Sequence, residues 1–243
     1  MTTLSPIQFQ SMALSAEDSY RARFAQELRR DLGDYVDDLT EPQLLRFVGV
    51  MLGEARSLGF RSAPEMQAFA RPCVVYGALS HLDPLFEPMF YAPLPGPGAR
   101  RRLSAAGVSE ATREVLAAEF RRRTGAQLVA DLAQHFLVGE HPAAGPRPVL
   151  EFHFHERAQR LRPGALEAHL ALAGSEADAL GLTDPDARRV HGDVAQLLGA
   201  CFARDPLYPW AELAFSVEAD DARRVDRLRA AMRRIASRVT QAG

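Results

Sequence analysis

The residues most suggestive of chemistry are two histidines, His153 and His155, that alternate with phenylalanines at the end of the run 149–155. This alternation favours a β-strand, on which both imidazoles would point to the same side, as metal-binding His-x-His pairs do. Further ligands would have to come from an acid such as Glu156 or from His135, His141 or His169. A metal-dependent hydrolase centred on His153 and His155 is therefore one alternative. We expect instead a polar strand or helix face beside a loop, with no metal bound.

Two other histidines lie two residues before an aspartate, in His81–Asp83 and His191–Asp193. Such pairs can act as general acid and base. Asp83, however, precedes Pro84, and an Asp-Pro step has a structural use as a corner that starts a helix. We therefore expect no catalytic role for these pairs.

Known catalytic motifs are missing from the sequence. It has no nucleophile elbow, no phosphate-binding loop, no dinucleotide-binding glycine pattern and no His-Glu-x-x-His. Cys73 and Cys201 lie in apolar stretches, which predicts free, buried thiols. We therefore predict no catalytic residues, no cofactor and no enzyme activity.

The amino-acid composition excludes further classes of function. The chain has 243 residues and a net charge of −2, and all 29 of its basic side chains are arginine, because it contains neither lysine nor asparagine. Lysine Schiff bases, a lysine general base, the phosphate-loop lysine and Asn-linked glycosylation are thereby excluded. The small net charge argues against a global field that recruits nucleic acid or anionic membranes. Since neither a signal peptide nor a membrane-spanning apolar stretch is visible, we expect a cytoplasmic protein without membrane contact.

Part of the first half of the sequence is repeated in the second half. When residues 54–86 are aligned with residues 176–208, a shift of 122, nine positions are identical without a gap. Self-similarity at a fixed spacing indicates an internal duplication. The matched residues include Gly59 with Gly181, Asp83-Pro84 with Asp205-Pro206, and Phe86 with Tyr208.

The repeated residues predict the same local structure in each copy. Gly59 and Gly181 each follow a helical pattern and precede an apolar residue, which is typical of a helix that ends in a left-handed glycine. Ser62 and Asp184 then stand at the N-cap of a second helix. Each copy should therefore consist of a helix, a glycine stop, a second helix and an Asp-Pro corner.

Helical periodicity extends over residues 5–31, 109–136 and 218–239. We therefore predict an all-α protein of two tandem, pseudo-symmetric helical units, with a short β-hairpin near 149–155 as its one strand element. The first unit spans residues 1–94, and a Pro-, Gly- and Arg-rich linker spans 95–103. The second unit spans 104–243 and includes an inserted loop at about 138–149 and an amphipathic C-terminal helix.

Three surface features bear on partners. The last helix is rich in arginine but also carries acids and has no aromatic ring among its arginines, which favours a solvated or protein-binding face. A nucleic-acid binder using this helix is the second alternative. Large rings follow each Asp-Pro corner, Phe86 in the first copy and Tyr208 and Trp210 in the second. Such rings serve either as core anchors or as interface hot spots, and core anchors are the default expectation. The apolar stretch 44–52 predicts either a central buried helix or a contact between copies, so a homo-oligomer stays open.

The second copy carries three distinctive segments: Ala-Leu-Gly-Leu at 179–182, Leu-Leu-Gly-Ala-Cys-Phe at 197–202 and Asp-Pro-Leu-Tyr-Pro-Trp-Ala at 205–211. Together they resemble small helical proteins encoded in bacterial type VI secretion clusters, although the first copy lacks the tryptophan. The resemblance implies an accessory, adaptor or immunity protein without an assigned active site, so no catalytic residue is transferred. We predict a non-catalytic protein that binds another protein, a secretion-system component or an effector.

Overall fold

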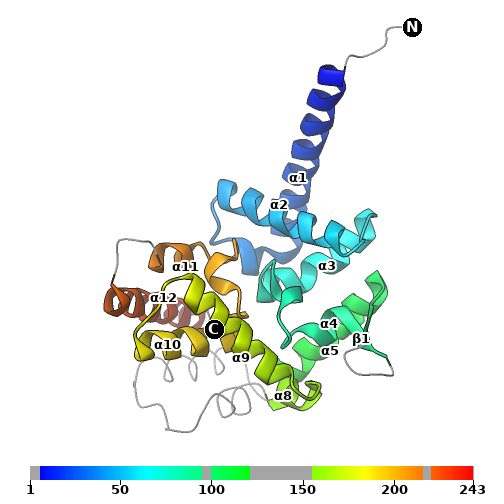
Figure 1. The fold of residues 1–243 in the computed structure, drawn as a ribbon. Coiled ribbons are helices and arrows are strands. Elements are labelled where there is room, and N and C mark those ends of the chain that lie inside the picture. Colours follow the sequence, from blue (N-terminus) through cyan, green and yellow to red (C-terminus); the bar gives the residue numbers. More distant parts are fainter. Residues whose placement is uncertain (1–5, 95–99, 121–154, 216–219, 243) are drawn as a thin grey trace, which may run out of the picture.

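The computed structural model describes residues 6–94, 100–120, 155–215 and 220–242, and these residues are mostly helical (Figure 1). The predicted mainly helical class with one short hairpin is confirmed. Within the described ranges, no helix combines the length and the apolar sequence that crossing a bilayer requires.

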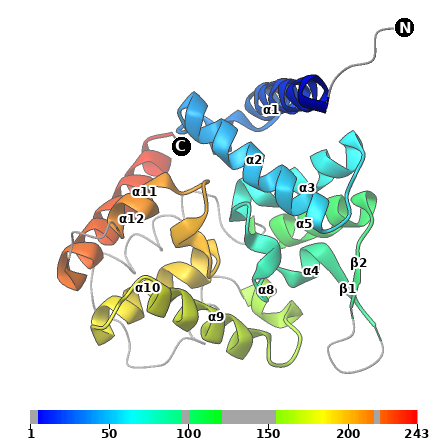
Figure 2. The ribbon, with the colours of Figure 1, turned by 45° about the horizontal axis from the view of Figure 1, so that its top comes forward.

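The first half of the chain is built around one buried helix. The starting turns of α1 extend away from the rest of the molecule, as Figures 1 and 2 show. The helix that follows, α2 (Glu41–Ser57), buries a stripe of apolar side chains, including Phe47 and Met51, while Arg46 in the same stretch 44–52 is exposed. The elements of this half are α1 (Pro6–Val36), α2 (Glu41–Ser57), α3 (Ala63–Tyr76), the 3-10 helix η1 (Ser80–Leu82) and α4 (Glu87–Phe90).

The β-hairpin does not lie where the sequence predicts it. β1 (Tyr91–Pro93) pairs antiparallel with β2 (Arg100–Arg102), so part of the predicted linker is a strand. Of the predicted hairpin, residues 149–154 lie outside the described residues, as does the predicted inserted loop at 138–149. His155 begins a helix.

After the hairpin, the chain packs against the first half again. The next helix, α5 (Ala105–Phe120), packs against α3 and α4, where it buries Val108, Thr112 and Val115. The segment that the sequence assigns to the start of the second unit therefore contributes to the core of the first half.

The second half lies beside the first, with α10, α11 and α12 on the side away from the hairpin (Figure 2). The last of these helices packs against both α10 and α11. The elements of this half are α8 (His155–Arg160), α9 (Ala165–Ala179), α10 (Pro185–Leu198), the 3-10 helix η2 (Phe202–Arg204), α11 (Pro209–Ala214) and α12 (Asp221–Ala242).

One series of elements recurs along the chain. Both α3 and η1 begin and end 122 residues before α10 and η2, and α2 ends 122 residues before α9. The backbone repeats as well, because Gly77 (φ 95°, ψ 155°) and Gly199 (φ 96°, ψ 149°) have nearly the same conformation. We call residues 41–86 the first motif and residues 165–208 the second motif.

Each motif turns between its two long helices in the way the sequence predicts. Gly59 and Gly181 have φ values of 85° and 70°, a conformation that favours glycine. The amide of the next residue donates back into the preceding helix, from Phe60 to the carbonyl of Ala55 (3.0 Å) and equivalently in the second motif. These are Schellman stops, which bury an apolar residue where each helix ends.

Candidate functional site

The Asp-Pro corners join the two motifs instead of starting helices. Asp83 Oδ1 and Asp205 Oδ1 accept hydrogen bonds from the amides two residues later, Leu85 and Leu207, at 2.8 and 3.0 Å. These contacts close a turn before a helix can begin, and α4 and α11 start only at Glu87 and Pro209. The expected helix start at Pro84 and Pro206 is therefore wrong, because the aspartates form Asx turns.

The second oxygen of each aspartate crosses to the other motif. Asp83 Oδ2 accepts from the backbone amide of Ala200 at 2.6 Å, and Asp205 Oδ2 accepts from that of Leu79 at 2.8 Å. Both carboxyl groups belong to buried residues, 1% and 4% exposed. Burial raises the pKa of Asp205, against the backbone amides, which lower it. The repeated aspartates therefore hold the two motifs together.

Two glycines leave space for the aspartate side chains that cross between the motifs. A Cβ atom on Gly77 would stand 2.5 Å from Asp205 Oδ2, and one on Gly199 would stand 3.1 Å from the ring of Phe86 and 3.5 Å from Asp83 Oδ2. Gly77 and Gly199 were not singled out as functional by the sequence, although both belong to the nine identical positions. Only the contact across the motifs shows why glycine recurs there.

Asp83 has a third partner that the sequence does not indicate. His169 Nδ1 lies 2.9 Å from Asp83 Oδ1, and the two side chains are 0% and 1% exposed. The pair has the composition of a catalytic dyad, but burial closes it to a substrate. His169 comes from α9, and 86 residues separate the partners, so no local pattern could have predicted the contact.

The two candidate His-Asp pairs have other surroundings than their sequence neighbours suggest. His81 Nε2 binds Glu54 Oε2 at 3.1 Å, and burial lowers the pKa of His81 while Glu54 raises it. His191 is fully buried between Phe202 and Phe215, and neither ring nitrogen has a hydrogen-bond partner within the described residues.

Buried His191 gives a testable pH dependence. Burial lowers its pKa to about 4 from the ordinary 6.5. Between those values the unfolded chain takes up a proton that the folded chain does not, so stability falls as the pH drops. His191→Phe, which copies Phe69 at the matching position, should raise the free energy of unfolding by about 1 kcal/mol at pH 7 and about 3 kcal/mol at pH 5. Urea unfolding at both pH values measures this.

The comparison needs a control because other groups titrate in the same range. Burial also raises the pKa of Asp193 to about 6, which gives the opposite pH dependence, but this contribution cancels between variant and wild type. His81→Phe is the matched control, and it should lower stability because it removes the partner of Glu54. An equal gain from His191→Phe at pH 7 and pH 5 would show that His191 does not titrate in this way.

The cysteines are buried, and the metal candidates lie mostly outside the described residues. Cys73 and Cys201 are free and buried, and burial raises the pKa of Cys201 to about 12, so its thiolate is scarce at neutral pH. No group of three or more His, Cys, Asp or Glu side chains that could hold a metal occurs among the residues searched, which are the described ones. His153 lies outside them, and His155 is described only as the first residue of α8.

The aromatic side chains after each corner lie mostly inside. Phe86 is 1% exposed and stacks on Tyr76 with ring centroids 4.7 Å apart. Tyr208 is 8% exposed, and its ring centroid lies 6.0 Å from that of half-buried Trp210. The first two rings therefore stabilise the core, and only the tryptophan reaches the surface.

Arginines of α12 bind the protein itself. Arg224 donates to the carbonyl of Leu180 at 3.1 Å, and Arg227 donates to the carbonyl of Leu213 at 3.3 Å. Arg229 lies 3.4 Å from Asp186. These contacts fix α12 to the residue that follows α9, to α10 and to α11.

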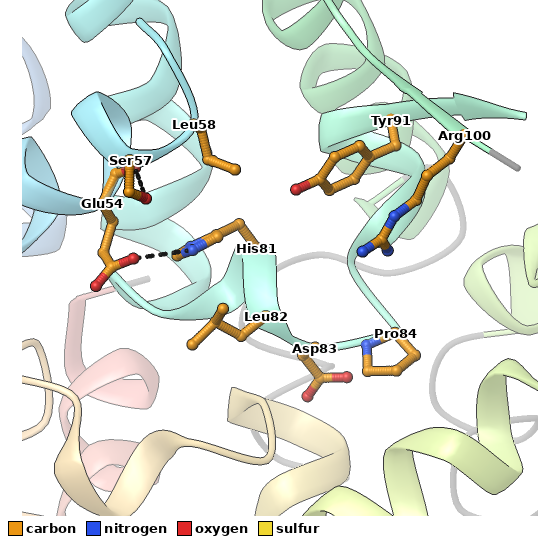
Figure 3. A pocket seen from close by; sticks show the side chains of 9 residues that line it. All are labelled: Glu54, Ser57, Leu58, His81, Leu82, Asp83, Pro84, Tyr91 and Arg100. Atoms are coloured by element: carbon orange, nitrogen blue, oxygen red, sulfur yellow. Dashed lines mark hydrogen bonds and ion pairs between the residues drawn. The ribbon is translucent and has the colours of Figure 1, made fainter. Parts of the chain in front are cut away.

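A hollow of about 230 Å³ opens on the first motif, and Figure 3 shows its lining. Glu54 and His81 form one side and the Tyr91 and Arg100 side chains the other (Figure 3). The guanidinium of Arg100 lies over the Tyr91 ring, 4.4 Å from its centroid. The lining consists of Glu54, Ser57, Leu58, His81, Leu82, Asp83, Pro84, Tyr91 and Arg100. This hollow is the candidate binding site.

Comparison with models of protein families, with curated proteins and with solved structures finds no match to this chain.

Proposed function

We propose that this chain is a non-catalytic protein that binds another protein, and that it serves a bacterial secretion system of the type VI kind as a cytoplasmic accessory, adaptor or immunity protein. The observation that supports this most directly is the pair of repeated aspartates. Asp83 and Asp205 are the most chemically suggestive residues of the repeat, yet their oxygens are taken by backbone amides of both motifs. These two recurring aspartates thus serve the scaffold, not a reaction.

Differences between the motifs support a binding role as well. The scaffold is shared, but several residues outside it differ, as Leu82 does from Arg204, and the first motif has a hollow lined by charged and apolar side chains. Leu82 at this hollow is 45% exposed, so its apolar side chain is open to contact with a partner. Surface residues that differ between two motifs of the same backbone structure suit recognition of a partner.

Affinity capture followed by reconstitution tests the proposal. The tagged full-length chain is incubated with lysate of the source organism, and proteins retained relative to a tagged helical control protein are identified by mass spectrometry. Each candidate is then purified and mixed with the chain. We expect one candidate to form a stoichiometric complex by size-exclusion chromatography and calorimetry.

Two results would contradict the proposal. One is that no captured protein forms a complex when purified. The other is a hydrolytic activity that is lost on metal chelation or in His153→Ala, which would favour the metal-dependent alternative instead.

A further inference from the structure

The same glutamate occurs in both motifs but is bound differently. Glu176 at the end of α9 is held by Arg204, whose Nε and Nη2 lie 2.9–3.1 Å from its two carboxylate oxygens. Among the described residues, Glu54, at the matching place on α2, has only the Nε2 of His81, 3.1 Å from Oε2. No arginine lies within ion-pair distance of Glu54 in the described part of the chain.

Glu54 has no arginine partner because the two motifs differ at one position of the repeat. The position of Arg204 in the second motif corresponds to Leu82 in the first, 122 residues earlier. Leucine carries no charge, and its side chain lines the hollow instead of covering the glutamate. Glu54 therefore keeps 32% of its side chain exposed, compared with 15% for Glu176.

The hollow has the chemistry to take a cationic side chain. Glu54 supplies a carboxylate whose Oε1 makes no hydrogen bond among the described residues, while Leu58, Leu82 and Tyr91 supply apolar walls. Arginine fits this pattern, because its aliphatic stem packs on apolar surface and its planar head binds a carboxylate in two places. Arg100 does not fill this role, since it lies over Tyr91 and 3.6 Å from Glu87.

We propose that this hollow binds an arginine side chain of a partner protein, whose guanidinium takes on Glu54 the place that Arg204 takes on Glu176. The inference rests on the proposed protein-binding function and names where the partner is held. The site lies on the first motif alone, because the chain's own Arg204 occupies the equivalent carboxylate in the second.

Binding of a small probe tests the site without knowledge of the partner. The probe is N-acetyl-arginine amide, which has the side chain but no charged terminus, and its binding to the full chain is followed by NMR chemical shifts or calorimetry. A single charge-assisted contact predicts a dissociation constant of roughly 1 mM. The citrulline analogue has the same shape but no charge, and it should bind about tenfold more weakly or not at all.

Matched variants locate the probe on Glu54. Glu54→Gln should weaken its binding at least about tenfold, while Glu176→Gln should leave it unchanged. Leu82→Arg copies the second motif and should abolish probe binding while the protein stays folded by circular dichroism, because the new guanidinium occupies Glu54.

Several outcomes would overturn the site. They are equal binding of arginine and citrulline probes, unchanged binding in Glu54→Gln or Leu82→Arg, and much tighter binding of free arginine than of the amide, which would indicate a small-molecule site. If a captured partner binds Glu54→Gln as tightly as wild type, this inference fails while the proposed function stands. If the probe binds Glu54 but no protein partner can be reconstituted, the protein-binding function fails, and with it the assignment of a partner's arginine.

Discussion

Replacing Gly77 with alanine should lower the free energy of unfolding by about 4 kcal/mol, whereas the same change at Gly59 should cost about 1 kcal/mol. Both glycines have positive φ, 95° and 85°, so both variants carry backbone strain. Only Gly77 faces the other motif, where the new Cβ would stand 2.5 Å from Asp205 Oδ2 and 2.9 Å from its Cγ. Around Gly59, no atom of a described residue beyond its immediate chain neighbours lies within 4 Å of that position.

Urea unfolding followed by circular dichroism measures both variants. The difference between them isolates the contact between the motifs from the backbone strain that they share. Should the two substitutions cost the same, close approach of Asp205 would not be the reason for glycine at position 77. If Gly77→Ala does not fold, Gly199→Ala provides a milder case, because its nearest contact would be 3.1 Å from the Phe86 ring.

Removal of the Asp83 carboxylate has the second large effect. Asp83→Ala should destabilise the protein by about 4 kcal/mol, because it leaves the amides of Leu85 and Ala200 and the buried imidazole of His169 without their shared acceptor. Asp184→Ala is the control. Asp184 also accepts from a backbone amide, that of Ala187 at 2.9 Å, but it is an exposed N-cap and its loss should cost about 1 kcal/mol.

The same denaturation experiment separates the two aspartates. Asp83→Asn keeps one acceptor oxygen, so its loss of stability should lie between those of Asp83→Ala and Asp184→Ala. This variant keeps the test informative if Asp83→Ala is too unstable to purify. A cost for Asp83→Ala no larger than that for Asp184→Ala would mean that the bond to Ala200 does not hold the motifs together.

Local structure was predictable from the sequence because its causes are local. The stops at Gly59 and Gly181 and the cap at Asp184 depend on residues only a few positions apart, and the helical class follows from periodicity. The hairpin at residues 91–102 could not be predicted in the same way. Its strands have three residues each, too few for alternation to show, and the run of prolines and glycines between them is typical of a linker.

The candidate site was less predictable than the fold. Asp83 had a sufficient local explanation as a corner, so nothing in the sequence required it to bind Ala200 or His169. His81 was paired with its neighbour in sequence, but its partner is Glu54 on another helix. The one available signal was the repeat itself, because Glu54 and Glu176 are identical while Leu82 and Arg204 are not.

The crossed aspartates also set an order of events during synthesis. The hydrogen bond from the Leu79 amide cannot form until Asp205, 126 residues later, has been synthesised. The hydrogen bond that Asp83 accepts likewise requires Ala200, 117 residues later. At about 5–20 residues per second, the first motif spends many seconds with these groups exposed to water. A nascent chain that has emerged only as far as α5 can close the local turn at Asp83 but lacks both crossed hydrogen bonds, which form only after the second motif has left the ribosome.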